Sequence, residues 1–348
     1  MKVSNFVKMA RRAIQKRRNI LVAGAAGIGK TELILQAVEA EGADVLISHA
    51  VTANPIDAKG MPTISKCRTF ADFVPFADLR RAMDQDPTKT LVWFLDDFGQ
   101  APESVQASFM QLILGRKING HKIPDSVCFF VATNRKQDRA GVRAILEPVK
   151  SRFVTLVELE PDVESWSDWA LAKLPDSIHT ATLVAFLRFS PDQFFIHAPT
   201  ADLTNSASPR TWKHASDVLE DFSDLGATVL DEMLIGAVGA DAFNFFDAFR
   251  KIQSELPTID SILDDPNSFD LSNVKPSVLW AIITALGMRA NAGNFAAVGR
   301  FAERLVEGHG EFAAMLVRDV IKRDPTIQNT PAFTSIITGD LGDLVAGN

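Results

Sequence analysis

The stretch from Ile20 to Thr31 reads ILVAGAAGIGKT and decides the fold. Its first four residues form an apolar run typical of a buried strand, and Glu32–Ala40 after it has the pattern of a helix. The loop between them, Gly24–Thr31, matches the P-loop pattern GxxxxGK[ST] in full. Glycines let backbone N–H groups turn inward around phosphate oxygens, and the helix N-terminus adds a partial positive charge. This strand–loop–helix order therefore predicts a site for the phosphates of a nucleotide.

Each residue of the loop has an expected part in binding ATP. Lys30 is expected to reach the β- and γ-phosphates, while the hydroxyl of Thr31 is expected to bind Mg²⁺. The residues predicted to hold the nucleotide through this loop are Gly24, Ala25, Ala26, Gly27, Ile28, Gly29, Lys30 and Thr31.

A second apolar run, Leu91–Leu95, ends in two carboxylates, Asp96 and Asp97. A buried strand that ends this way places its acids at the carboxyl edge of the sheet, beside the phosphates of a P-loop protein. We expect Asp96 to hold Mg²⁺ through water and Asp97 to orient or deprotonate the attacking water. The alternative is a solvated acidic turn without function.

Short apolar runs alternate with helical stretches between residues 19 and 160, which is the pattern of an α/β domain with a mostly parallel sheet. A helix is expected over Glu103–Leu114, and Asn119-Gly120 after it favours a tight hairpin turn. From about Asp162 onward the pattern is helical, with a further helix expected near Arg210–Phe222. The five expected strands are Ile20–Ala23, Val45–Ser48, Leu91–Leu95, Val127–Ala132 and Phe153–Leu156.

Composition narrows the class of protein. The net charge of −7 argues against a generally basic nucleic-acid binder. Cys67 and Cys128 are far apart, without the spacing of a disulfide framework or a zinc site, so we expect a reducing compartment such as the cytoplasm. The six histidines show no metal-ligand spacing. No apolar run approaches the roughly 18–20 residues that a membrane-spanning helix needs.

Residues 1–18 are basic and contain no acid. Phe6, Val7, Ala10 and Ile14 fall at helical spacing, so we expect a folded first helix with its apolar side against the body. A nucleic-acid-binding arm and an organelle targeting signal are the alternatives.

Polar and charged residues recur where the expected strands and helices end. They lie in the acidic pair and helix start Asp96–Gln106, the hairpin Ile118–Ile123, the strand end Phe130–Arg135, the helix end Val149–Phe153 and the helix start Pro209–Trp212. This succession, within residues 19–225, resembles the MoxR branch of the AAA+ ATPases. The resemblance implies a P-loop AAA+ core with a parallel five-stranded sheet flanked by helices (residues 1–160), a helical lid (161–227) and a further helical C-terminal region (228–348).

The resemblance also implies roles for single residues. Asn134 would help to position the attacking water, and Arg210 would contact the γ-phosphate from the lid. Arg152 would act as an arginine finger in the site of a neighbouring subunit, with Arg143 as a second candidate. The resemblance further implies that the protein assembles with itself as a ring, a hexamer, and remodels a protein client that has a von Willebrand factor A domain.

Two features depart from the family pattern. Asp97 stands where the family normally has Glu, which predicts slow catalysis because its carboxylate is one methylene shorter. Gly99-Gln100 stands where the family often has Asn-Arg. A nucleotide-gated scaffold with little turnover is therefore one alternative function, and a nucleic-acid motor or loader is another; a small-molecule kinase fits less well.

The segment Asn54–Ala82 is expected to carry loops that face a substrate or a central pore. Ala58–Pro62 reads as a turn, with apolar side chains crowded after it. Those side chains either pack as core under the next helix or face the pore. They are Phe70, Phe73, Val74 and Phe76.

Overall fold

The computed structural model describes residues 1–135, 138, 145–196, 198, 202–254, 258–339 and 341–346. The chain divides into two compact units, Met1–Asp162 and Val163–Asn348. Arg143, the second candidate for the arginine finger, lies outside the described residues.

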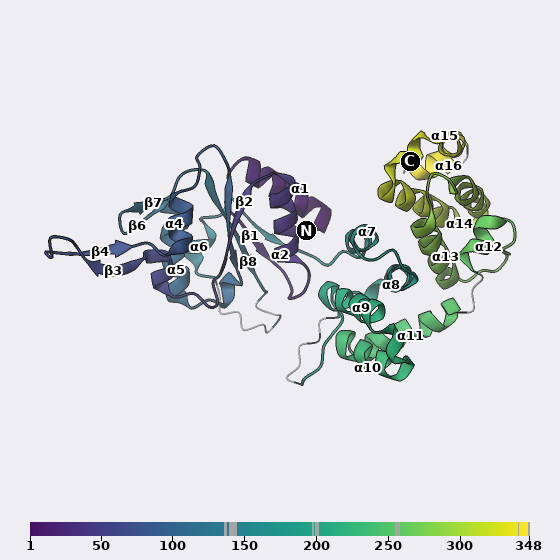
Figure 1. Cartoon of the computed structure of the whole chain (residues 1–348), viewed down its shortest axis with the longest axis horizontal. Helices are drawn as coiled ribbons and strands as arrows, with labels where there is room; N and C mark the ends of the chain where they lie inside the picture. The colour runs from purple at the N-terminus through teal and green to yellow at the C-terminus, as the bar shows by residue number, and fades with distance from the viewer. Residues whose placement is uncertain are drawn as a thin grey trace. The chain divides into compact units, whose positions relative to one another are not determined.

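The first unit is built on a five-stranded sheet in the order β2-β5-β8-β1-β9, in which every neighbouring pair of strands is parallel. Helices α1 and α2 lie on one side of this sheet, and α4, α5 and α6 lie on the other (Figure 1). The strands are β1 (Ile20–Ala23), β2 (Asp44–His49), β5 (Leu91–Asp96), β8 (Val127–Thr133) and β9 (Thr155–Glu158). The helices are α1 (Val3–Gln15), α2 (Lys30–Ala40), α3 (Pro55–Lys59), α4 (Ala77–Met83), α5 (Glu103–Gly115) and α6 (Glu147–Lys150).

The predicted fold class, a parallel α/β P-loop core followed by a helical region, is confirmed. One strand differs: β9 begins at Thr155, two residues after the predicted start at Phe153. The amide of Phe153 donates instead to the carbonyl of Lys150 at 3.2 Å, in a turn that continues α6. Because that backbone group is used in the turn, the strand starts only after it.

Aromatic packing ties the sheet to α5. Trp93 of β5 stacks on Phe129 of β8 at 5.3 Å between ring centroids and meets the edge of Phe109 from α5 at 5.9 Å. All three rings are at most 2% exposed. This core fixes α5, and with it the chain that follows Asp97, against the centre of the sheet.

The predicted first helix is also confirmed. Phe6, Ala10 and Ile14 of α1 are at most 1% exposed, so the apolar side of the helix packs on the unit. On the polar side, Arg11 pairs with Glu41 at 2.6 Å, next to the end of α2. Lys8, Arg11 and Arg12 therefore belong to a folded helix of the first unit, and the other basic residues flank it.

Two hairpins extend from the same end of this unit (Figure 1). The β6–β7 hairpin (Lys117–Ile118 and His121–Lys122) forms at Asn119-Gly120 as predicted. The β3–β4 hairpin (Met61–Ile64 and Ala71–Val74) was not predicted. In and just after this hairpin, the side chains of Phe70, Val74 and Phe76 lie on the surface, with exposed fractions of 60%, 55% and 36%. The interpretation of these three as core is therefore wrong.

The second unit is helical, as predicted. Phe186 of α8 packs against Trp212 of α9 and Phe246 of α11 at 5.5 and 5.3 Å. This core joins residues from both sides of the predicted lid boundary at 227, and the division into lid and C-terminal region stays a prediction. The helices are α7 (Val163–Lys173), α8 (Ile178–Phe189), α9 (Pro209–Asp221), α10 (Ala227–Val238), α11 (Ala240–Ser254), α12 (Ile259–Asp264), α13 (Pro276–Arg289), α14 (Phe295–Arg323), α15 (Pro331–Thr338) and α16 (Leu341–Ala346). No helix in the described ranges is long and apolar enough to cross a membrane.

A buried ion pair joins α8 to α14 in this unit. The Arg188 side chain is 1% exposed, and its guanidinium donates to both carboxylate oxygens of Asp319, whose side chain is 8% exposed. Glu164 of α7 lies 3.4 Å from the same guanidinium. A buried charge without its partner is costly, so this pair fixes which face of α14 meets α8.

Replacing Asp319 alone should therefore destabilise the second unit strongly. We expect Asp319→Ala to lower the free energy of unfolding by about 3 kcal/mol, because Arg188 loses its buried partner and keeps only the more exposed and more distant carboxylates of Glu164 and Asp168. The double variant Arg188→Met/Asp319→Leu should recover most of this loss. Hydrogen exchange of the α8 and α14 amides measures both values. A loss below about 1 kcal/mol for Asp319→Ala would contradict the assignment.

The two cysteines should differ sharply in reactivity. Hydrogen bonds from Ser65 and Thr69 lower the pKa of the exposed Cys67 thiol to about 7, whereas burial raises the pKa of Cys128 to about 12. Alkylation of the folded protein should thus label Cys67 alone, with a rate that rises as the pH increases through 7 and the thiolate forms. Mass spectrometry of iodoacetamide-treated protein checks this, with Cys67→Ser as the control. Equal labelling of Cys128 would show that the sheet is open.

Candidate nucleotide-binding site

The P-loop leaves β1 and enters α2 through a glycine-dependent path. Gly27 and Gly29 have φ of +78° and +92°, a region that residues with a Cβ rarely adopt. A Cβ on Gly24 would lie 2.5 Å from Cδ1 of Ile28 and 3.2 Å from the carbonyl oxygen of Leu159. Each of the three glycines in the motif therefore has a physical reason to be glycine: the backbone conformation at Gly27 and Gly29, and close packing at Gly24.

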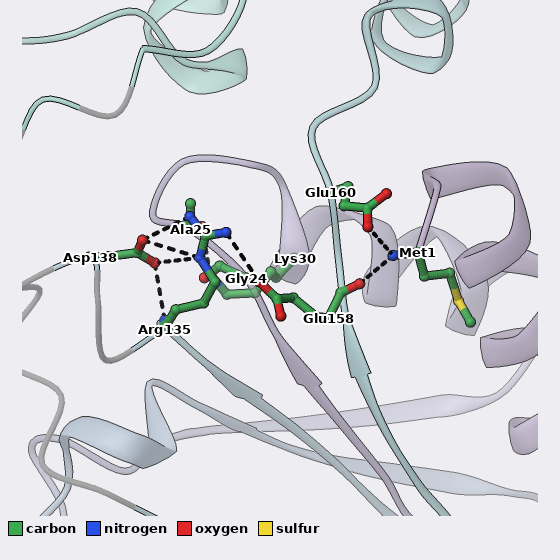
Figure 2. Close-up of polar contacts among 8 residues, drawn as sticks. All are labelled: Met1, Gly24, Ala25, Lys30, Arg135, Asp138, Glu158 and Glu160. Carbon is green, nitrogen blue, oxygen red and sulfur yellow. Dashed lines mark hydrogen bonds and ion pairs between the residues drawn. The ribbon is translucent and has the colours of Figure 1, made fainter.

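Lys30 is turned back into the loop and is 7% exposed. Its ammonium donates to the carbonyl oxygens of Gly24 and Ala25, both at 2.9 Å, and to Oδ1 of Asn134 at 2.7 Å. Figure 2 shows Lys30 beside these two loop residues. The ammonium thus lies at the mouth of the loop, between the P-loop and the end of β8.

Thr31 and Asp96 meet although they are far apart in the sequence. The hydroxyl of Thr31 donates to Oδ2 of Asp96 at 2.9 Å, and the other carboxylate oxygen of Asp96 accepts the amide of Asp97 at 3.0 Å. The carboxyl end of β5 and the first turn of α2 are therefore in contact. The structure brings together the two residues that were predicted to hold Mg²⁺.

These two residues suit magnesium. A hydroxyl and a carboxylate are hard oxygen donors, and Mg²⁺ is usually bound by one or two carboxylates together with water and substrate phosphates. Within the described ranges there is no group of three or more His, Cys, Asp or Glu side chains that could hold a metal by itself. Such a pair fits a metal that arrives with the nucleotide.

Asn134 lies between Lys30 and Asp97. It is 8% exposed; its Oδ1 accepts from Lys30, and its Nδ2 lies 3.5 Å from Oδ1 of Asp97. Asp97 has a left-handed backbone, with φ of +52°, which directs its side chain away from the path of β5. An amide can accept from a cation and donate to an anion at once, which a carboxylate or a second amine cannot do.

Arg135, next in the chain, has contacts that the sequence did not reveal. Its guanidinium pairs with Asp138 at 2.8 Å and with Glu158 of β9 at 3.1 Å (Figure 2). The hydrogen bond to Asp138 raises the pKa of Arg135 above its ordinary value. The carbonyl of Glu158 also accepts from the amino group of Met1. Arg135 therefore fixes the chain after Asn134 to the edge of the sheet.

Gln106 connects the chain after the acidic pair to α6, the helix that precedes the predicted finger Arg152. Its side chain is fully buried in α5; Nε2 donates to the carbonyl of Ala101 at 3.2 Å, and Oε1 accepts the amide of Leu146 at 3.2 Å. One bond reaches the chain just after Asp97, and the other reaches the residue before α6. The predicted motif marked Gln106, and the structure supplies its contacts.

The two predicted arginines lie elsewhere. Arg152 follows α6, is partly exposed, and donates to the carbonyl of Pro148 in that helix. Arg210 belongs to the second unit, where it is exposed in the first turn of α9, inside a capping box made by Ser208 and Thr211. The roles of Arg152 as a finger and of Arg210 as a lid residue stay predictions.

Comparisons with known proteins give similarity at low identity. No protein-family model matches the sequence, and no curated protein matches it. Among solved structures, a RuvB variant of Thermotoga maritima is 14% identical and has a TM-score of 0.44, covering 80% of this chain and 84% of that chain. NtrX from Brucella abortus in complex with ATP is 15% identical and has a TM-score of 0.40, covering 96% of this chain and 65% of that chain. The assignment of the site therefore depends on the contacts described above.

The Thr31–Asp96 contact predicts how binding depends on magnesium. Thr31→Val keeps the shape of the side chain but removes the hydroxyl, so ATP should bind about equally with and without Mg²⁺. Thr31→Ser keeps the hydroxyl and should retain the dependence. Titration of a fluorescent ATP analogue, in magnesium and in a chelator, measures both. An unchanged magnesium effect in Thr31→Val would exclude this residue as a ligand.

Proposed function

We propose that this chain is an ATPase of the AAA+ class that binds MgATP at Gly24–Thr31. The observation that carries the proposal is the set of contacts around Lys30: a buried ammonium at the P-loop, touching Asn134, which in turn lies beside Asp97. A P-loop alone binds phosphate. A cation, a polar amide and a carboxylate held together beside it also supply what phosphoryl transfer to water needs.

The chemistry follows from these side chains. Lys30 would exchange its two carbonyl acceptors for the β- and γ-phosphate oxygens of ATP. Asp97 would accept a hydrogen bond from the attacking water and take its proton as the water oxygen bonds to the γ-phosphorus. The bond from the γ-phosphorus to the β–γ bridging oxygen breaks at the same time, and ADP leaves. Asn134 would hold the carboxylate and the water in line. A magnesium ion, when bound through Thr31 and Asp96, supplies charge neutralisation on the phosphates.

A ring is the proposed assembly, as the resemblance to the MoxR branch implies. Within its own chain Arg152 bonds to Pro148, so the proposed acceptor is the γ-phosphate bound by a neighbouring subunit. Gln106 supports this proposal, because it joins the chain after Asp97 to the start of α6, the helix that precedes Arg152. A hexamer and a client with a von Willebrand factor A domain remain the finer proposals.

Slow turnover is the second candidate function, and one observation favours it. Asp97 is a short acid, and the 3.5 Å between its carboxylate and Asn134 is long for a hydrogen bond. A nucleotide-gated scaffold would bind ATP, assemble, and release its partner at the slow rate of ATP hydrolysis. The proposals therefore differ in rate and share the same site.

Steady-state ATP hydrolysis over a series of protein concentrations tests the proposal. If the site is shared between subunits, the rate per protomer should rise with concentration. Arg152→Ala should lower the rate by on the order of 10³-fold, since a finger stabilises charge in the transition state. Arg18→Ala, an exposed arginine of the same unit, is the matched control. A rate per protomer independent of concentration, unaffected by Arg152→Ala, would contradict the ring.

Substitution of Asp97 separates the motor from the scaffold. Asp97→Asn should abolish hydrolysis while leaving ATP binding intact, because the carboxylate is needed only in the transition state. If the short acid limits the rate, Asp97→Glu should increase kcat. Equal rates for the wild type and Asp97→Asn would show that this residue is not the catalytic base.

A further inference from the structure

The two hairpins of the first unit behave as one structural element, which we call the hairpin arm: residues 59–76 and 117–122. Asn119 of the β6–β7 turn donates to the carbonyl of Lys59 at 2.9 Å, and Nε2 of His121 lies 2.8 Å from the carbonyl oxygen of Phe73. A lone two-stranded hairpin is marginally stable in water. One contact holds the end of α3, just before β3, and the other holds β4.

The charge of the hairpin arm is opposite to that of the chain. It carries five cationic side chains against one acidic side chain, Asp72, which gives +4 in a chain whose total is −7. All five are exposed, and none of them pairs with an acid among the described residues. The cationic residues are Lys59, Lys66, Arg68, Lys117 and Lys122.

The same element exposes apolar side chains. Ile64 is 75% exposed and Phe70 is 60% exposed at the end of the β3–β4 hairpin, and Met61 and Val74 are 57% and 55% exposed at its base. Met61 pairs directly with Val74, so these two share one face, while Ile64 points to the other. The β3–β4 hairpin of the arm projects beyond the labelled helices of its unit (Figure 1). Grouped exposed apolar side chains of this size mark an interaction surface.

We propose that the hairpin arm binds a polypeptide segment that is acidic and apolar, on the partner protein. This inference rests on the proposed function, because it names the chemistry of the client on which the ATPase acts. Charge complementarity gives the acidic character of that segment, and the exposed apolar side chains give its apolar character. The contact between the arm and the partner would bury apolar area and neutralise the unpaired cations.

The alternative occupant, a single-stranded nucleic acid, fits the surface less well. Such sites interleave cations with aromatic rings on which bases stack. Of the five exposed large apolar side chains of the arm, Met61, Ile64 and Val74 carry no ring, and Phe70 and Phe76 are the two rings, with Phe76 only 36% exposed.

The arm is connected to the nucleotide site through the core. Helix α5 runs from the chain after Asp96-Asp97 to the β6–β7 hairpin, and Phe109 within it packs on Trp93 of β5. A displacement of the acidic pair on hydrolysis can therefore reach His121 and, through it, Phe73 of the β3–β4 hairpin. This path gives ATP turnover a means to move the bound segment.

Fluorescence anisotropy with full-length protein tests the inference. The probes are short labelled synthetic peptides, one of Glu, Leu and Phe, one of Lys, Leu and Phe, and one of Glu and Ser, together with a labelled oligothymidylate. The Glu/Leu/Phe peptide should bind, and added salt should weaken its binding. Lys66→Glu/Arg68→Glu should weaken it by about tenfold or more, and Ile64→Ser/Phe70→Ser should do the same. Lys8→Glu, an exposed lysine of α1, is the matched control and should leave it unchanged.

Three outcomes would overturn the inference: tighter binding of the oligothymidylate, equal binding of the Lys/Leu/Phe peptide, or no binding of any probe. Parallel titration with a fluorescent ATP analogue keeps the two proposals apart. Both arm variants should bind ATP as the wild type does, because the arm lies outside the P-loop. Peptide binding without ATP hydrolysis would support the hairpin arm as a peptide-binding surface and contradict the proposed ATPase. ATP hydrolysis without peptide binding would support the ATPase and contradict the proposed role of the arm.

Discussion

The first unit depends on one buried cation. Lys30 is enclosed by the loop that precedes it, and a buried ammonium is tolerated only when it is hydrogen-bonded or paired. Two P-loop carbonyls and Asn134 accept from it at 2.7–2.9 Å. Because these acceptors come from both β1 and β8, the position of the ammonium fixes how the P-loop sits on the sheet. The nucleotide site is therefore part of the folded core.

The acidic pair is linked to distant surfaces through rigid packing. Gln106 joins the chain after Asp97 to the helix before Arg152, and the Trp93–Phe109 contact joins β5 to the helix that leads to the hairpin arm. Under the proposed function, a change at the γ-phosphate would reach the proposed subunit contact and the proposed client surface by this route. Packed elements transmit strain because protein interiors have few voids into which it could relax.

The parts that could be predicted share a local signal. Residue type and spacing were enough to predict the P-loop, the strand that ends in Asp96-Asp97 and the Asn119-Gly120 turn. The structure contains all three. The β3–β4 hairpin was missed because its strands, Met61–Ile64 and Ala71–Val74, are short and exposed and lack alternation. The Arg135–Glu158 pair spans different strands of the sheet, a separation that no local pattern reveals. The second unit could be recognised as helical, while the pairing of Arg188 with Asp319 could not.

Calorimetric titration of MgATP into the wild type and into Lys30→Met tests the central claim most directly. Methionine fills the space of the lysine stem without its charge, so the fold of the loop should persist. We expect saturable binding with one ATP per chain in the wild type, and affinity lower by about 100-fold or more in Lys30→Met, because a buried charged contact is lost. Equal affinities for the two proteins would contradict the assignment of Gly24–Thr31 as the nucleotide site.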